Sequence, residues 1–322
     1  MTMVSAPGNI FLLGEHAVIY GRPGIVSAIN LKTKCEIEKR EDSIVSISSK
    51  GYGEFTGKIN DLKSPEEYKE RIDLIKDLVS TFYQKFKIKD GINLKIDSDI
   101  PRDSGGMSSS TAVLCSVLGA MNKTFPRIDK KDFYDFLIPF QRKIHGGVAS
   151  GVEFFSSIFG GYNKVLTNPV KYKNLGELKL PILIVNTGVE AKTSETVPYV
   201  RSGWEQDKKS YEDVFNTIEQ LVEDGEKAIK KEDLVKLGSL MLENHDLLAK
   251  ELGVSHPKLN RIVRVAMGNG AYGAKLSGGG KGGVAIILVD KEKENRIIEK
   301  LDFCKVYKTE IGVGGVFKLK NI

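Results

Sequence analysis

The sequence is poor in cysteine and has no long hydrophobic run. Its three cysteines, Cys35, Cys115 and Cys304, lie far apart without a close pair, which argues against a disulfide framework and against a zinc site. The most apolar stretch, residues 111–121, is far shorter than the roughly 20 residues that a membrane-spanning helix needs. The N-terminus has no basic start followed by an apolar core, so we expect no signal peptide. These absences predict a protein of the reducing cytoplasm, with no membrane partner.

A strong excess of one charge is absent as well. The 322 residues include 48 Lys and Arg against 42 Asp and Glu, which leaves a net charge of +6 spread along the chain. No dense Lys/Arg block with interleaved aromatic residues is present, so nucleic acid is not an expected partner. Apolar residues make up 41% of the chain, a proportion typical of globular proteins with a large core. At roughly 150 residues per domain, the length predicts two domains.

Hydrophobic patterning predicts a chain of the α+β class. Residues 64–67 have the composition of a helix start, and helical spacing follows over residues 74–82. A turn-rich connection at residues 164–176 places the domain boundary near residue 170, which gives domains 1–170 and 171–322. The other expected elements are strands at 92–96, 182–186, 283–289, 305–310 and 316–319, and helices at 109–121, 205–223, 233–251 and 257–267.

A glycine- and serine-rich loop at residues 101–111 joins an expected strand to the apolar helix. Gly105 and Gly106 permit positive φ and close backbone approach, and the helix start that follows favours an anion. The three serines at 108–110 add hydroxyls that suit phosphate oxygens or Mg²⁺. The loop is not a Walker motif, because no Gly-Lys-Ser/Thr follows the glycines. A serine-capped helix after a flexible turn explains the same residues equally well.

Three other segments carry residues suited to chemistry. Residues 277–283 contain five glycines in seven positions, which suits a backbone wrapped around a phosphate, the alternative being a mobile linker. Glu15 and His16 follow an apolar strand and fit a pocket wall, although a surface turn is the more common reading of such a triplet with Gly14. Glu153 follows a small-residue loop, where an apolar setting would suit a general base and an exposed helix start is the alternative.

Together these segments resemble the signature motifs of the GHMP kinase family, and most closely those of its mevalonate-phosphorylating members. The three main blocks occur in the family's order at residues 5–29, 105–113 and 273–283. Two weaker blocks, VASGVEFFSSIFGG and ELGVSHPKLNRIV, agree with them. The resemblance implies an N-terminal domain like ribosomal protein S5 and a C-terminal ferredoxin-like domain. It also implies ATP and Mg²⁺ as cofactors, transfer of phosphate to the 5-hydroxyl of mevalonate for isoprenoid synthesis, and a homodimer as one expected assembly.

The resemblance assigns roles to particular positions of this sequence. The catalytic residues would be Glu153 and Asn9. The nucleotide would be bound by Gly105, Gly106, Met107, Ser108, Ser109, Ser110 and Thr111, the acceptor by Glu15, His16, Ser150, Thr193, Gly278 and Gly279, and the metal by Ser109, Ser110 and Gln141.

Three of these positions depart from the family pattern. Asn9 stands where the family usually has a lysine, Glu153 where it has the catalytic aspartate, and Gln141 where it has a magnesium-binding glutamate. Lys281 or Arg102 is the expected source of the missing positive charge. The departures keep two alternatives open. The first is a kinase for another small alcohol, such as a phosphorylated mevalonate, a sugar or an amino-acid alcohol, and the second is a relative that binds ATP without catalysis.

Overall fold

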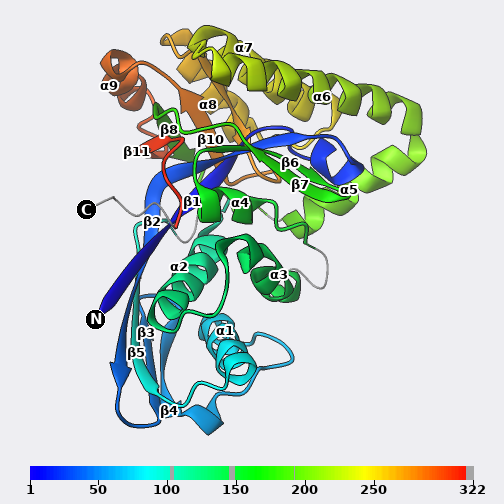
Figure 1. Cartoon of the computed structure of the whole chain (residues 1–322). Helices are drawn as coiled ribbons and strands as arrows, with labels where there is room; N and C mark the ends of the chain where they lie inside the picture. The colour runs from blue at the N-terminus through cyan, green and yellow to red at the C-terminus, as the bar shows by residue number, and fades with distance from the viewer. Residues whose placement is uncertain (102–104, 145–148, 192, 317–322) are drawn as a thin grey trace.

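The computed structural model describes residues 1–101, 105–144, 149–191 and 193–316. A central sheet runs through the molecule, and the helices of the two halves of the chain lie at its two ends (Figure 1). The strands are β1 (Thr2–Leu13), β2 (Gly24–Arg40), β3 (Ile44–Ser49), β4 (Gly53–Lys58), β5 (Gly91–Ser98), β6 (Tyr162–Thr167), β7 (Val170–Asn174), β8 (Leu180–Asn186), β9 (Gly273–Ser277), β10 (Val284–Leu288) and β11 (Lys305–Ile311). The helices are α1 (Arg71–Phe86), α2 (Ser109–Thr124), α3 (Phe133–Ile144), α4 (Glu153–Phe159), α5 (Thr193–Gln206), α6 (Lys208–Lys230), α7 (Leu234–Asp246), α8 (Pro257–Gly268) and α9 (Lys291–Glu299).

The sheet has the strand order β4-β3-β5-β2-β11-β8-β10-β9, with β1 and the β6–β7 hairpin attached through β2. Only β3 and β5 run parallel among the pairs of described strands. Strands β2 and β11 meet at one register pair, Ile29 with Ile311, so the join between the two halves of the sheet is narrow. Helices gathered at the two ends of a largely antiparallel sheet confirm the expected α+β class. The boundary expected at residue 170 falls at the start of β7, which pairs with β6, and the division into domains stays a prediction.

Helix α2 is the centre of the first half of the molecule. Every residue from Thr111 to Met121 is buried, because the helix lies between the β1–β2 hairpin and helices α1, α3 and α4. A helix that is apolar all round is stable only in such an enclosed position. The apolar helix expected at residues 109–121 is therefore confirmed, and its first turn, with Ser109 and Ser110 half-exposed, lies where the buried part of the helix begins.

The helix start expected at residues 64–67 is wrong. Helix α1 begins at Arg71, where Glu70 and Asp73 form a capping box. The preceding loop is held in an irregular conformation because buried Asp77 accepts hydrogen bonds from Ser64 Oγ and from Tyr68. These tertiary contacts outweigh the local composition that favours a helix start.

The helix expected at residues 205–223 is also interrupted in the structure. Helix α5 ends at Gln206, and Asp207 caps a new helix by accepting a hydrogen bond from the Ser210 N–H at 3.1 Å. The expected strands at 92–96, 283–289 and 305–310 correspond to β5, β10 and β11. Most of the strand expected at 316–319 lies outside the described residues.

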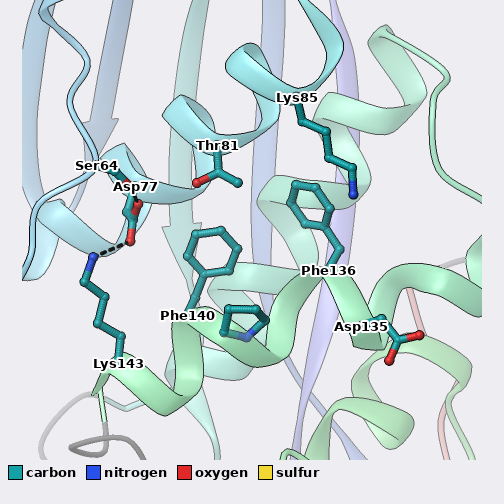
Figure 2. A pocket seen from close by; sticks show the side chains of 9 residues that line it. Ser64, Asp77, Thr81, Lys85, Asp135, Phe136, Phe140 and Lys143 are labelled. Atoms are coloured by element: carbon teal, nitrogen blue, oxygen red, sulfur yellow. Dashed lines mark hydrogen bonds and ion pairs between the residues drawn. The ribbon is translucent and has the colours of Figure 1, made fainter.

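A surface pocket of about 330 Å³ lies between α1 and α3 (Figure 2). Phe136 and Phe140 line it, and Lys85 and Lys143 lie at opposite ends. The Lys143 ammonium pairs with Asp77 at 3.0 Å, which ties α3 to α1. None of the expected site residues is among the described residues that line this pocket, so it is separate from the candidate site below.

None of the helices in the described part of the chain combines the length and apolarity needed to cross a bilayer. All three cysteines are free, with Cys35 and Cys115 buried and Cys304 half-buried.

A cluster of charges joins the β6–β7 hairpin to α6. The Glu226 carboxylate on α6 pairs with Lys164 of β6 at 3.0 Å, Lys173 of β7 at 2.7 Å and Lys230 of its own helix at 2.6 Å. Burial opposes ionisation of Glu226, but the hydrogen bonds and charges of the three lysines outweigh it and lower the pKa to about 2. A carboxyl group with a lowered pKa stabilises the fold above its unfolded pKa and loses that contribution as the pH falls towards the folded value.

We therefore expect Glu226→Gln to lower the free energy of unfolding at pH 7 by about 1–2 kcal/mol, because three ammonium groups lose a shared counter-charge. The difference from the wild type should shrink as the pH falls from about 4.5 to about 2. Urea unfolding at several pH values measures it. Asp224→Asn, which removes an exposed pair with Lys227 on the same helix, is the control. A Glu226→Gln deficit that does not change with pH would contradict the electrostatic origin.

Candidate active site

The two glycine loops of the sequence meet in the folded protein. A Cβ atom placed on Gly106 would lie 2.9 Å from the Ser277 carbonyl oxygen, and one placed on Gly278 would lie 3.4 Å from the Gly106 Cα. Gly106 and Gly278 have φ of +78° and +89°, which only glycine adopts without strain. The structure thus brings the loop before α2 against the loop between β9 and β10, although about 170 residues of chain separate them.

The loop before α2 presents an uncapped helix N-terminus. The bond from the Ala112 N–H to the Ser108 carbonyl, at 3.1 Å, is the first of the helical series, so the N–H groups of Ser109, Ser110 and Thr111 precede it. The side chain of Ser108 makes no capping hydrogen bond. N–H groups ahead of the first helical bond and the positive end of the helix dipole make this position suitable for an anion such as a phosphate.

Gln141 and Glu153 lie beside that helix start. The Gln141 side chain is buried, and its Nε2 donates a hydrogen bond to Glu153 Oε1 at the first turn of α4. After burial, the Glu153 charge is the second cause that raises the pKa of the Cys115 thiol, which lies one turn beyond Thr111 on α2. Gln141 Oε1 and Thr111 Oγ1 are buried and have no hydrogen-bond partner among residues 1–101, 105–144, 149–191 and 193–316. An amide, a hydroxyl and a carboxylate therefore supply oxygen atoms around the start of α2.

The loop after β1 contains a buried ion pair. Glu15 Oε1 pairs with the ammonium of Lys275 on β9, and both side chains are inaccessible to water. Burial raises the pKa of Glu15 and lowers that of Lys275, while each charge opposes the shift of its partner. Sequence reasoning missed Lys275. The signal was there, because a single lysine in an otherwise apolar strand needs a counter-charge if the strand is buried.

His16 adds a second polar group at the same place. Its Nε2 lies 2.9 Å from the Gly279 carbonyl oxygen, which requires that this nitrogen carries the proton and donates. Burial lowers the pKa of His16 to about 4, so the ring is neutral at pH 7. Its Nδ1 is then an acceptor, and this atom and Glu15 Oε2 are both buried with no hydrogen-bond partner in the residues that the structure describes. Two neighbouring residues of one loop thus leave unused hydrogen-bond acceptors.

Helix α7 supports this loop from behind. Asn244 Oδ1 accepts a hydrogen bond from the Gly14 N–H at 3.3 Å, and His245 Nδ1 accepts one from the Leu276 N–H at 3.3 Å. Burial lowers the pKa of His245 to about 4, which keeps this ring neutral as well. Both residues therefore fix β1 and β9 in the positions that the ion pair requires.

The remaining expected residues are placed unevenly. Asn9 contacts the loop before α2 and the first turn of α4, as Ser108 donates to Asn9 Oδ1 at 2.8 Å and Asn9 Nδ2 donates to the Glu153 carbonyl at 3.0 Å. Lys281 lies in the loop between β9 and β10, with its ammonium 3.5 Å from the centre of the Tyr199 ring. The Ser150 carbonyl accepts a hydrogen bond from Tyr134 at 2.7 Å. Thr193 is the first residue of α5, and Arg102 lies outside the described residues.

Comparison with known proteins identifies two family models in the chain. The model of the GHMP kinases N terminal domain matches residues 73–161, and the model described as GHMP kinases C terminal matches residues 226–308. The mevalonate kinase of Pyrococcus abyssi is 29% identical over 309 residues, which cover 91% of this chain and 90% of that protein. The mevalonate kinase of Pyrococcus horikoshii is 30% identical over 299 residues, which cover 89% and 88%. A crystal structure of mevalonate kinase superposes with a TM-score of 0.84 and 24% identity over 97% of this chain and 99% of that one, which establishes a common fold.

The buried ion pair gives a first test of the site. Lys275→Met should lower the free energy of unfolding by about 3 kcal/mol, because Glu15 then stays buried without a counter-charge. The double variant Glu15→Gln/Lys275→Met should lose clearly less than the single variant, since no charge is left unpaired. Urea unfolding followed by the fluorescence of Trp204 measures both.

Lys250→Met is the matched control, because Lys250 pairs with Asp246 on the protein surface. Its effect should stay below about 1 kcal/mol. Equal losses of unfolding free energy in Lys275→Met and in Glu15→Gln/Lys275→Met would contradict this prediction. They would show that an unpaired buried charge is not what destabilises the single variant.

Proposed function

Because the chain belongs to the GHMP kinase family, we propose that it transfers the γ-phosphoryl group of ATP to the 5-hydroxyl of mevalonate, giving phosphomevalonate for isoprenoid synthesis. It is a small-molecule kinase, and the curated relatives named above, which match it over nearly their whole length, are mevalonate kinases. The observation that carries the proposal is the pair of acceptor atoms Glu15 Oε2 and His16 Nδ1, which have no hydrogen-bond partner within the described part of the chain and lie next to two glycine loops in mutual contact. Acceptor atoms of this kind suit hydroxyl groups of a substrate.

The nucleotide would lie over the start of α2. Main-chain N–H groups of residues 105–111 would hold the phosphates at the helix N-terminus, and Gly278 would close on them from the other side. The proposed contacts of the acceptor alcohol stay Glu15, His16, Ser150, Thr193, Gly278 and Gly279. Phosphoryl transfer depends mostly on such positioning and on charge stabilisation.

Glu153 is the proposed base or orienting carboxylate. The acceptor oxygen forms a bond to the γ-phosphorus while the bond from that phosphorus to the leaving oxygen of ADP breaks. The proton of the acceptor hydroxyl goes to the Glu153 carboxylate. The hydrogen bond from Gln141 supports this role, because it fixes the direction in which the carboxylate faces.

Mg²⁺ is the proposed metal, and the residues present fit it. Gln141 Oε1, which is buried and has no hydrogen-bond partner among the described residues, and the hydroxyls of Ser109 and Ser110 are hard oxygen donors. Magnesium in nucleotide sites usually keeps several waters and takes substrate phosphates as ligands, so few protein oxygens are needed. When bound, the ion would neutralise charge on the transferring phosphoryl group. A cytoplasmic location and a homodimer stay proposals that rest on the sequence.

The reaction is tested by ADP release from the purified protein with Mg-ATP. The acceptors are mevalonate, phosphomevalonate, galactose and homoserine, each at matched concentration. We expect turnover with mevalonate and at least tenfold less with the other three, because the two acceptor atoms are fixed by the ion pair and by Gly279. Turnover with another acceptor alone would show a changed specificity, and ATP binding without any turnover would show a non-catalytic relative.

The role of Glu153 is tested by Glu153→Gln, which keeps the size of the side chain. Loss of a general base lowers kcat by roughly 10²- to 10⁴-fold, and we expect a fall in that range. The affinity for a non-hydrolysable ATP analogue should change less than about threefold, since the main-chain N–H groups hold the phosphates. Glu205→Gln, at an exposed position on α5, is the control and should retain full activity. Unchanged kcat in Glu153→Gln would exclude the proposed role.

A further inference from the structure

Asn9 is buried, and each polar atom of its side chain contacts the protein. Its Oδ1 accepts the hydrogen bond from Ser108 Oγ, and its Nδ2 donates to the Glu153 carbonyl and to Ser157 Oγ at 3.2 Å. Its main-chain N–H donates to the Met107 carbonyl at 3.2 Å. A single residue of β1 therefore connects the loop before α2 with the first turn of α4.

Ser108 has a main-chain conformation that makes this contact important. Its φ of +52° lies in the left-handed region, which costs free energy for every residue that has a Cβ atom. The hydroxyl of a residue at a helix start would ordinarily cap that helix, but here it donates to Asn9. The hydrogen bond to Asn9 thus helps to hold the loop in a strained form whose N–H groups face the proposed phosphate site.

The main chain around Asn9 leaves little freedom. The pairing of β1 with β2 shifts register between Pro7 and Asn9, and a Cβ on Gly8 would lie 2.7 Å from the Met107 carbonyl oxygen. Ser157 Oγ also donates to the Pro7 carbonyl at 2.8 Å. The strand, the loop and α4 are therefore in direct contact at this point, and a small change at Asn9 displaces both neighbours.

We propose that Asn9 is a positioning residue, which acts through Ser108 and the main chain of Glu153 to fix the phosphate-binding loop relative to the carboxylate of Glu153. The inference rests on the proposed kinase function and deepens it. Asn9 has no remaining amide hydrogen bond directed to a substrate in this arrangement, since both ends of the amide are engaged. In place of the expected catalytic role, we assign to Asn9 the control of the distance between the loop before α2 and the Glu153 carboxylate.

The side chain must be an amide for this role. Ser108 needs an acceptor at position 9, while the Glu153 carbonyl and Ser157 need a donor. A lysine, the residue that the family resemblance leads us to expect there, has donors only and would leave the Ser108 hydroxyl without its acceptor. Asn9→Lys should therefore lower activity. If the only effect of Asn9 were the lack of a positive charge at this position, the same substitution would raise activity.

The test is a double-mutant cycle of Asn9→Leu and Ser108→Gly, in which glycine adopts the φ of +52° without strain. The first readout is the dissociation constant of the protein for Mg-AMPPNP, a complex of the non-hydrolysable ATP analogue, measured by calorimetry in the absence of mevalonate. We expect each single variant to bind Mg-AMPPNP about tenfold more weakly than the wild type. The double variant should bind no more than about threefold more weakly than either single variant, because both substitutions remove the same hydrogen bond between Asn9 and Ser108. Multiplied effects, about 100-fold in the double variant, would overturn the proposal.

The second readout separates positioning from folding. With mevalonate as acceptor, Asn9→Leu should lower kcat while the KM for mevalonate stays within about twofold. The matched control is Asn163→Leu, because Asn163 is equally buried and donates to Ser156 Oγ and the Gly160 carbonyl without touching the loop before α2. It should lose stability without loss of AMPPNP affinity. An equal loss of AMPPNP affinity in Asn163→Leu would reduce Asn9 to a structural role. Absence of turnover by the wild type would contradict the proposed function, while the AMPPNP cycle would still decide the positioning role.

Discussion

The ion pair between Glu15 and Lys275 places two full charges in the interior, where neither reaches water. Removing such groups from water costs several kcal/mol per ion, and only good pairing geometry offsets this. The pair lies where the loop after β1 must meet the loop after β9, and the next hydrogen bond along, from His16 to Gly279, joins the same two loops. Asn244 and His245 hold the two strands from the opposite side. The relative position of the loop after β1 and the loop after β9 therefore depends on electrostatic contacts, with apolar packing around them.

The sequence predicted the parts of this arrangement that are local. Glycines at 106 and 278 indicate a close approach of two loops, where a Cβ atom would be crowded, and the apolar run of α2 indicates a buried helix. Contacts between residues far apart in the sequence could not be predicted from composition or hydrophobic patterning. Lys275 and Glu15 are 260 positions apart, and neither shows which partner it has until the chain folds. The start of α1 was misplaced for the same reason, since Asp77 holds the preceding loop through side chains of Ser64 and Tyr68. The departures from the family pattern at positions 9, 141 and 153 could be identified from the sequence. The hydrogen bonds that join Asn9 and Gln141 to Glu153 could not.

Those substitutions form a consistent set when charges are counted. Compared with the residues that the family resemblance leads us to expect, Asn9 removes one positive charge and Gln141 removes one negative charge, while Glu153 keeps the charge of an aspartate. The net charge of the three positions is unchanged. Two neutral amides replace a cation and an anion, and the Gln141 amide donates a hydrogen bond to the Glu153 carboxylate. Such a paired exchange keeps the field at the transferring phosphoryl group closer to its original value than either exchange alone would.

The burial of α2 along residues 111–121 has a consequence for how this protein experiences dissolved salt. Mobile ions weaken the field of an exposed charge within about 10 Å at 0.1 M ionic strength, but they cannot enter a close-packed interior. The peptide dipoles of α2 are surrounded by the sheet and by three other helices for most of their length. The first turn is different, because Ser109 and Ser110 are half-exposed, and salt therefore still weakens the attraction of an anion to the helix start. The enclosed length of α2 holds the direction of the helix fixed, while its free end responds to ionic strength as a surface site does.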